Sequence, residues 1–238
     1  MTEKNGKNGM NKTKKILIVL AAVLLLLGGS VAVLPRLLWG DAVDYSKVVS
    51  IRTSGGFQEP RLLSMAWQLP VAKTYQAGLD FQKNGSFCGP TSVVNLSRSL
   101  GMPATQAKIL DDSGISTVLG GLPGGITLDQ LSELAGKKLK KHVTVLRDLS
   151  LAEFREQMVR TNDPSVRYLI NFHRGPLFGQ GGGHHSPIGG YLSAEDLVFV
   201  LDVNASYKPW LVKTERLYEA QNTSDRATGK KRGLLRIE

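Results

Sequence analysis

The sequence contains almost no cysteine. Cys88 is the only one among 238 residues, which excludes an internal disulfide framework and a zinc site built on several thiolates. The chain has no internal repeats, and beyond its first 15 residues it has no low-complexity tract. The net charge is +10, but basic and aromatic residues are not interleaved, so no nucleic-acid partner is expected. The hydrophobic fraction of 42% is enough for one well-packed domain.

The N-terminal region combines a basic segment with an apolar one. Residues 1–15 carry five lysines against Glu3 alone, and no charged residue occurs in residues 16–34. At 1.5 Å per residue, the apolar segment would span ~28 Å as a helix, close to the hydrocarbon thickness of a bilayer. This pattern predicts a single transmembrane anchor, with a cleaved signal peptide as the alternative.

The domain organisation follows from that anchor. We expect a cytoplasmic basic tail at 1–15, the anchor at 16–34, a linker at 35–59 and a globular domain at 60–238. The positive-inside rule places the lysines in the cytoplasm. The domain would then lie on the extracytoplasmic side, which in a bacterium is the periplasmic side of the inner membrane.

The remaining chain predicts helices first and antiparallel strands later, which is typical of an α+β fold. Capping boxes at Thr127 and Ser150 predict helix starts, and Gly136 predicts a helix end. Tyr191 to Leu197 is short enough for a hairpin loop. The expected elements are helices after Cys88, Thr127 and Ser150 and at 214–220, and strands at 142–146, 167–172, 184–191, 197–201 and 233–237.

Cys88 lies where a helix is expected to begin. Pro90 suits a first helical turn, and Gly101 and Pro103 predict the end of the helix. The positive end of a helix dipole stabilises a thiolate, so Cys88 is a candidate nucleophile. The alternative is that Cys88 is a small buried hydrophobic residue.

A base for that nucleophile occurs in the second half of the chain. The predicted hairpin would bring His184 beside Asp202, which could orient the imidazole ring for proton transfer. Gln82, six residues before Cys88, could supply an oxyanion donor. Alternatively, His184 is a polar loop residue, Asp202 caps a strand and Gln82 lies on the surface. His185 stays open as the base in place of His184.

Several blocks of the sequence together resemble the phytochelatin synthase family, in its short bacterial form. The similarity covers roughly residues 60–238 and rests on FQKNGSFCGPTSVVNLSRSLG, GGITLDQLSELAG, INFHRGPLFGQGGGHHSPIGGY, LVFVLDVNASYKPWLVKTERLYEAQNTSD and KKRGLLRI. This resemblance implies a papain-like cysteine peptidase fold, with an N-terminal helical part and an antiparallel sheet, that acts on glutathione.

The resemblance also implies roles for particular residues. Cys88 would be the nucleophile and His184, as the first residue of the H-x-S-P block, the base. Asp202 would orient His184, and Gln82 would belong to the oxyanion hole. The residues implied for substrate binding are Asn171, Arg174, Gly183, Asp225 and Arg232, and no metal-ligating residue is implied.

The implied activity is that of a glutathione γ-glutamylcysteinyltransferase in thiol metabolism or heavy-metal detoxification. Glycine would leave from glutathione through a Cys88 thioester, giving γ-glutamylcysteine and, more weakly, phytochelatins. No cofactor is required, and Cd or Zn ions would enter as glutathione thiolate complexes; a homodimer is left open. One alternative is another envelope papain-like peptidase that cuts wall peptides or double-glycine leaders. Another is a non-enzymatic, membrane-anchored thiol or metal-binding protein.

Overall fold

A computed structural model describes residues 43–238, and residues 45–238 form one compact unit. The predicted segments 1–15 and 16–34, and the first part of the predicted linker 35–59, lie outside the described residues. Among the residues that are described, no helix is long and apolar enough to cross a bilayer. The anchor therefore stays a prediction.

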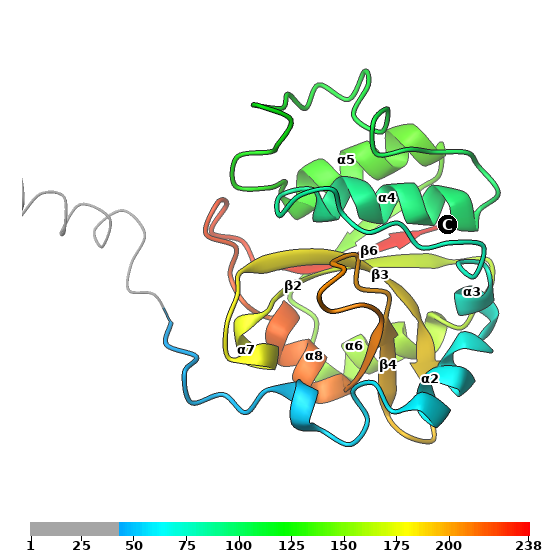
Figure 1. Ribbon diagram of the computed structural model, residues 1–238, viewed down its shortest axis with the longest axis vertical. Coiled ribbons are helices and arrows are strands. Elements are labelled where there is room, and N and C mark those ends of the chain that lie inside the picture. Colours follow the sequence, from blue (N-terminus) through cyan, green and yellow to red (C-terminus); the bar gives the residue numbers. More distant parts are fainter. Residues whose placement is uncertain (1–42) are drawn as a thin grey trace, which may run out of the picture. The chain divides into compact units, whose positions relative to one another are not determined.

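The centre of the domain is a six-stranded sheet in the order β1-β6-β2-β3-β4-β5, and every neighbouring pair is antiparallel. The predicted α+β class is confirmed (Figure 1). The strands are β1 (Val143–Leu146), β2 (Arg167–His173), β3 (Gly183–Leu192), β4 (Leu197–Val200), β5 (Trp210–Lys213) and β6 (Gly233–Ile237).

Helices cover both faces of this sheet. The helical elements are η1 (Ile51–Thr53), α2 (Pro60–Trp67), α3 (Pro70–Lys73), α4 (Cys88–Ser99), α5 (Leu128–Leu139), α6 (Leu151–Arg160), α7 (Gly175–Phe178) and α8 (Thr214–Gln221). Figure 1 shows α4 and α5 on one side of the sheet and α6 and α8 on the other. The first of these faces also carries α2 and α3, which pack over the strands β3, β4 and β5.

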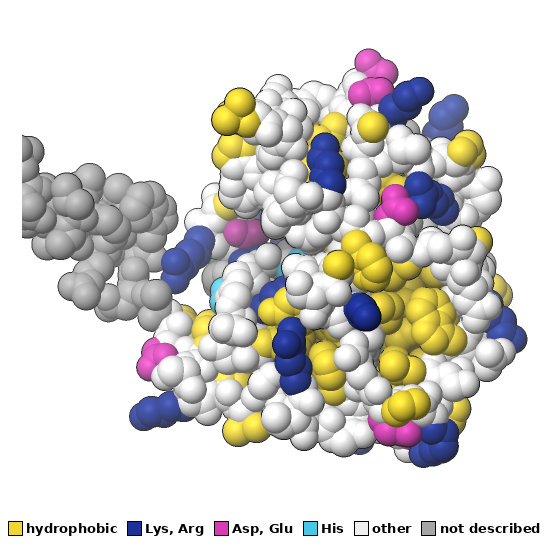
Figure 2. All heavy atoms as spheres, viewed as in Figure 1, with side chains coloured by type: hydrophobic (Ala, Val, Ile, Leu, Met, Phe, Trp, Pro, Cys, Tyr) yellow, Lys and Arg dark blue, Asp and Glu magenta, His cyan; other side chains and the backbone are white. Residues whose placement is uncertain are grey.

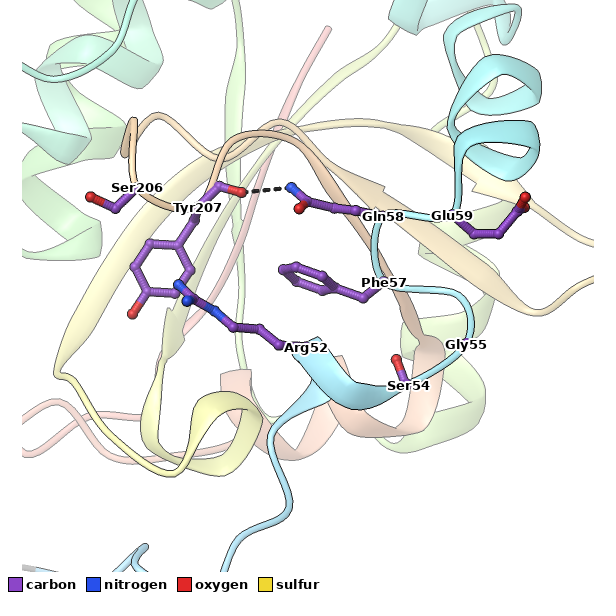
Figure 3. Close-up of a pocket in the computed structure, with 8 residues that line it drawn as sticks. All are labelled: Arg52, Ser54, Gly55, Phe57, Gln58, Glu59, Ser206 and Tyr207. Atoms are coloured by element: carbon purple, nitrogen blue, oxygen red, sulfur yellow. Dashed lines mark hydrogen bonds between the residues drawn. The ribbon is translucent and has the colours of Figure 1, made fainter.

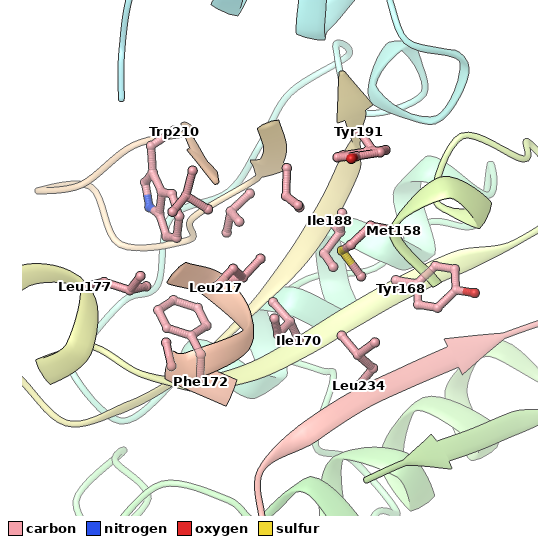
Figure 4. Close-up of a cluster of buried hydrophobic side chains, with 14 of the residues drawn as sticks. Met158, Tyr168, Ile170, Phe172, Leu177, Ile188, Tyr191, Trp210, Leu217 and Leu234 are labelled. Atoms are coloured by element: carbon pink, nitrogen blue, oxygen red, sulfur yellow. The ribbon is translucent and has the colours of Figure 1, made fainter. Parts of the chain in front are cut away.

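The central strand β2 is buried on both faces, and every residue from Arg167 to Phe172 is buried. Tyr168, Ile170 and Phe172 pack toward α6 and α8 (Figure 4). Leu169 points to the opposite face and packs with the residues of α4 and α5. A strand covered on both faces is fixed in register, which holds the neighbouring strand β3 in place.

Both predicted capping boxes are present. Thr127 and Gln130 exchange hydrogen bonds at the start of α5, and Ser150 and Glu153 do so at the start of α6. The predicted end of α5 at Gly136 was wrong. The helix continues to Leu139, which is buried, and Lys140 ends it in the left-handed conformation. Burial of Leu139 outweighed the helix-breaking tendency of a single glycine.

The compact unit begins earlier than the boundary near residue 60 that the sequence suggests. Ile51 and Phe57 are core residues, and the backbone N–H of Leu211 donates to the Phe57 carbonyl at 2.8 Å. The last part of the predicted linker 35–59 is therefore packed onto the domain. The sequence alone could not decide this segment, because its pairing with β5 joins residues more than 150 positions apart.

Figure 2 shows the surface of one face of the domain. Lys and Arg side chains are scattered over it and do not form a continuous stripe. Hydrophobic side chains gather on the side of this face that carries α2. Partly buried Leu63, Trp67 and Leu79 belong to the cluster beneath α2, and Phe81 is 37% exposed.

Candidate active site

Cys88 is the first residue of α4, as the sequence predicted. No side chain caps this helix, so its first backbone N–H groups stay available to a ligand. Hydrogen bonding from the backbones of His185 and Gly89 favours the ionised Cys88 sulfur and helps to lower its pKa. The thiol is only 6% exposed, yet it lines a cavity, which a residue used only for packing would not do.

The start of α4 is pressed closely against the loop before α5. A Cβ added to Gly89 would lie 2.7 Å from the Ile126 side chain. Only glycine fits at this position without displacing Ile126. The glycine after Cys88 therefore lets the loop at Gly124–Ile126 form one wall of the cavity.

The β3–β4 hairpin brings His184 and Asp202 together. Leu192 pairs with Leu197 across the hairpin, and the backbone N–H of Leu201 donates to the Pro187 carbonyl at 2.9 Å. His184 Nε2 lies 3.0 Å from Asp202 Oδ1. This contact uses Nε2, so Nδ1 is the ring nitrogen left for proton exchange with Cys88.

Asp202 is completely buried, and each of its oxygens accepts several hydrogen bonds. Arg174 Nη2 donates to Oδ1 at 3.0 Å and to Oδ2 at 2.9 Å. Trp210 Nε1 donates to Oδ2 at 2.9 Å, and the backbone N–H of Asn204 donates to Oδ1 at 2.8 Å. A buried carboxylate needs such partners to stay ionised.

The pKa values of the three groups shift in directions that favour an ion pair. Burial raises the pKa of Cys88, but the charge of His184 and the hydrogen bonds to the sulfur outweigh it, so the net shift is downward. Burial lowers the pKa of His184, but the charge of Asp202, the charge of Cys88 and the hydrogen bond to Asp202 together raise it more, so the net shift is upward. Burial opposes ionisation of Asp202 too, yet His184 and Arg174 lower its pKa to about 2.

His185 is held in a different network. Its Nε2 lies 3.0 Å from the Ile126 carbonyl, and its ring contacts Asn171 Nδ2. Burial, together with nearby positive charge, lowers the pKa of His185 to about 4. The structure therefore places His184, and not His185, on the carboxylate of Asp202.

Gln82 lies in the loop that precedes Cys88 and helix α4. Its Nε2 donates to the Asn84 carbonyl at 2.7 Å, and its Oε1 is buried without a hydrogen-bond partner. An amide nitrogen carries two hydrogens, so one donor of Gln82 remains for a ligand. Its backbone N–H donates to the Val203 carbonyl at 2.7 Å, which ties Gln82 to the segment after Asp202.

A cavity of about 280 Å³ lies beside Cys88 and is lined by both polar and apolar groups. Arg232 Nη1 lies 3.1 Å from Asn171 Oδ1 and 3.6 Å from Asp225 Oδ2. A Cβ on Gly183 would lie 2.5 Å from Arg232 Nη1, so the glycine makes room for the guanidinium. The lining residues are Gly85, Ser86, Cys88, Gly124, Gly125, Ile126, Asn171, Gly183, His185, Asp225 and Arg232.

The structure thus gathers four of the five predicted substrate-binding residues at one cavity and places the fifth elsewhere. Arg174 does not line the cavity; it is 5% exposed and is bound to Asp202. Sequence reasoning missed Trp210 and Ile126. Both lie in sequence blocks that carry the family resemblance, but neither had been given a role in the site, although the glycines before Ile126 were a signal that the backbone there could approach a ligand closely.

No group of three or more His, Cys, Asp or Glu side chains within residues 43–238 could hold a metal ion. The chemistry available at the site is that of a thiolate, an imidazole and a buried carboxylate. In such an arrangement the carboxylate orients the histidine, and the histidine can activate the cysteine as a nucleophile.

Comparison with known proteins assigns the chain to a family. The family model of phytochelatin synthase matches residues 57–234, so the chain belongs to the phytochelatin synthase family. Glutathione gamma-glutamylcysteinyltransferase 3 of Lotus japonicus is 38% identical over 117 residues, which are 48% of this chain and 24% of that protein. The glutathione gamma-glutamylcysteinyltransferase of Schizosaccharomyces pombe is 31% identical over 117 residues, 48% of this chain and 28% of that protein. The chain matches only about a quarter of the length of these relatives.

Solved structures give a weaker likeness. A C39-like peptidase from Bacillus anthracis is 15% identical, with a TM-score of 0.48 over 69% of this chain and 95% of that chain. The peptidase domain of Streptococcus ComA is 18% identical, with a TM-score of 0.46 over 66% of this chain and 94% of that chain. The family assignment therefore rests on the sequence match.

Proposed function

We propose that this protein is a papain-like cysteine enzyme that cleaves glutathione, transferring its γ-glutamylcysteinyl group. The observation that carries the proposal is the contact of His184 with Asp202 at 3.0 Å beside a Cys88 that opens a helix and lines a cavity. Membership of the phytochelatin synthase family supports glutathione as the substrate class. The relatives' names describe the same transfer.

The cavity fits the γ-glutamyl end of glutathione. That end carries an α-ammonium and an α-carboxylate, and the cavity offers Asp225 and Arg232 as groups of opposite charge. The guanidinium of Arg232 can bind a carboxylate through two parallel hydrogen bonds. Asn171 and Gly183 border the same space, and Asn171 holds Arg232 in place.

The acylation step uses the groups around Cys88. The Cys88 thiolate attacks the carbonyl carbon of the Cys–Gly bond, and the negative oxygen that develops is held by the Cys88 backbone N–H and the free donor of Gln82. His184 then gives its proton to the glycine nitrogen as the C–N bond breaks. A γ-glutamylcysteinyl thioester remains on Cys88.

The thioester can be resolved in two ways. Water, deprotonated by His184, gives γ-glutamylcysteine and regenerates the thiol. The amine of a second glutathione gives a phytochelatin instead, and a Cd or Zn ion would enter as the thiolate complex of that acceptor. No bound metal or cofactor is needed for either step.

The proposal extends to the place of the protein in the cell. The apolar run 16–34 with lysines before it supports an inner-membrane anchor with the domain on the periplasmic side. The proposal also includes a homodimer of this protein. A measured molecular mass in solution of twice that of the chain would reveal it.

The test is to incubate the full-length chain with glutathione and measure free glycine. We expect glycine release, equal amounts of γ-glutamylcysteine when water is the acceptor, and a γ-glutamylcysteinyl adduct on Cys88 in mass spectra. The Cys88→Ala variant should lose all three signals.

A matched substrate separates this activity from that of another envelope peptidase. The isomer with an α-linked glutamate has the same atoms but presents its ammonium and carboxylate differently, so it should be cleaved much more slowly. Cleavage of both isomers at equal rates, or glycine release that persists in Cys88→Ala, would contradict the proposal.

A further inference from the structure

Arg174 is a buried cation whose partner belongs to the site, although Arg174 itself does not line the cavity. Its Nη2 bridges both oxygens of Asp202 at 3.0 and 2.9 Å. The side chains of Arg174 and Asp202 are 6% and 0% exposed. A guanidinium buried at this depth requires a compensating negative charge, and Asp202 supplies it.

Aromatic rings enclose this guanidinium. Its Cζ lies 3.7 Å from the centroid of the Tyr207 ring, and 5.6 and 5.7 Å from the centroids of Phe178 and Phe172. Figure 3 shows Arg52, from η1, reaching across the same Tyr207 ring, with a separation of 4.6 Å from the centroid. The Arg174 head is therefore fixed by groups from β2, α7 and the loop after β4.

The loop before β3 is shaped to admit Arg174. Gly181 has a φ of +92°, and a Cβ there would lie 3.0 Å from the Cβ of Arg174. The backbone N–H of Arg174 also donates to the Gly182 carbonyl at 2.9 Å. The glycine-rich segment before His184 thus lets Arg174 and His184 contact the same carboxylate, that of Asp202.

We propose that Arg174 is a positioning residue that fixes the orientation of Asp202 and limits the negative charge that Asp202 presents to His184. The proposal rests on the proposed function, in which His184 exchanges a proton with the substrate. It replaces the role in substrate binding that the sequence suggested for Arg174.

The geometric part of the argument concerns rotation of the carboxylate. With Arg174 Nη2 on both oxygens, rotation of the Asp202 carboxylate would break this bridging contact as well as the bond to His184. Trp210 and the Asn204 backbone hold one oxygen each. His184 is thereby kept in the ring orientation that leaves Nδ1 facing Cys88.

The electrostatic part concerns how tightly His184 holds its proton. The titratable and charged groups that face His184 are Cys88 from α4, Asp202 after β4, Arg174 before α7 and His185 on β3. Asp202 favours the imidazolium, and Arg174 opposes it. Because His184 must release its proton to the leaving amine, a cation that weakens the hold of Asp202 assists that transfer.

Alkylation of Cys88 by iodoacetamide tests the electrostatic part without any substrate. Cys88 is the only cysteine in the chain, so the reagent reports on a single thiol. The rate should depend on pH through two inflections that belong to the coupled Cys88–His184 pair. In Arg174→Gln the upper inflection should move to higher pH by about 0.5 unit or more. An unchanged upper inflection would overturn the proposal.

Arg52→Gln is the matched control. Arg52 packs on the same Tyr207 ring as Arg174, and its hydrogen bonds within residues 43–238 do not include Asp202. Its alkylation profile should therefore match that of the wild type. A shift equal to that of Arg174→Gln would show that the aromatic packing, and not the contact with Asp202, is responsible, and would overturn the proposal.

Arg174→Lys tests the geometric part and covers the case in which Arg174→Gln does not fold. Lysine keeps the charge but lacks the planar guanidinium that stacks on the Tyr207 ring and fixes Nη2 between the two oxygens, so kcat for glycine release should fall about tenfold or more while KM stays within about twofold. A rise in KM with unchanged kcat would return Arg174 to substrate binding. Because alkylation uses no glutathione, a shifted profile without glycine release would refute the proposed substrate and leave the positioning role intact.

Discussion

At the residue scale, the geometry of a β-strand separates the two adjacent histidines. Successive side chains of a strand point to opposite faces. His184 pairs across the sheet with Phe172, and His185 pairs with Asn171. Only His184 can therefore share a face with Asp202, and His185 is directed to Ile126 and the cavity wall. Strand alternation therefore supports His184 as the proposed base.

This separation predicts different effects of two substitutions. His184→Ala removes the proton donor and the orientation of the thiolate, so acylation of Cys88 should slow by about 10³-fold or more. His185→Gln keeps a donor for the Ile126 carbonyl and should leave acylation within about tenfold of the wild type. The measurement is the rate at which the acyl adduct appears by rapid-quench mass spectrometry. The opposite ranking of the two variants would assign the base to His185.

The shifted pKa values predict a bell-shaped pH dependence. Activity requires a deprotonated Cys88 and a protonated His184. The pKa of Cys88 is lowered and the pKa of His184 is raised, and both shifts favour the active ion pair. On the acid side the thiolate is lost, and on the alkaline side the imidazolium is lost. The profile of kcat/KM for glycine release checks this. A rate that rises monotonically with pH would show that an isolated thiolate carries the reaction.

At the scale of elements, the start of β3 determines both the site and the cavity. Gly183 lets Arg232 approach, and His184 follows at once toward Asp202. A methyl group on Gly183 would meet the Arg232 guanidinium at 2.5 Å. Since the flexible end of Arg232 can move away, the cost should fall on substrate binding more than on folding.

Gly183→Ala should therefore raise KM for glutathione by about tenfold, roughly the loss of one charge-assisted contact, while kcat changes less. Gly182→Ala is the matched control, because nothing lies within 4 Å of a Cβ at that glycine. The two variants differ by one position in the same loop. Equal KM values for both would show that Arg232 does not bind the substrate.

The contact between β3 and the loop before α5 predicts how stability depends on pH. His185 has a folded-state pKa of about 4, below its usual value of about 6.5. The unfolded chain therefore takes up this proton first. The contribution of His185 to stability is present above about pH 6.5 and is lost as the pH falls toward its folded-state pKa.

Thermal melts should show this dependence. The melting temperature should fall between about pH 6.5 and pH 4, and His185→Gln should flatten that part of the curve. His142→Gln is the control, because His142 is exposed at the start of β1. A curve for His185→Gln that is parallel to the wild type would show that other groups govern the acid sensitivity.

At the scale of the whole molecule, we predict that membrane attachment depends on the N-terminal region and that glycine release depends on the domain. The compact unit begins at Tyr45, and the family model begins at residue 57. The apolar run at 16–34 lies before both. Removal of residues 1–42 should thus move the protein from the membrane fraction to the soluble fraction without loss of glycine release.

Fractionation of expressing bacteria, followed by the glycine assay on each fraction, measures both properties. The expected result is activity in the membrane fraction for the full chain and in the soluble fraction for the shortened chain. Recovery of the full chain in the soluble fraction with an intact N-terminus would refute the anchor. A shorter mature chain would indicate cleavage after the apolar run.

The sequence by itself determined what depends on residues close together in the chain. Pro90 after Cys88 specified a helix start, and the two capping boxes specified the starts of α5 and α6. The short connection from Tyr191 to Leu197 specified a hairpin, which brought His184 to Asp202. These features are local because capping and tight turns are decided within a few residues.

Only the tertiary structure decided which partners the buried polar groups would take. Arg174 binds Asp202, His185 binds the Ile126 carbonyl, and Trp210 completes the shell around the carboxylate. Each contact joins different elements, and each has competitors of the same chemical type in the sequence. Burial selects among them, because a polar group removed from water must find whichever partner the packed helices and strands bring within reach.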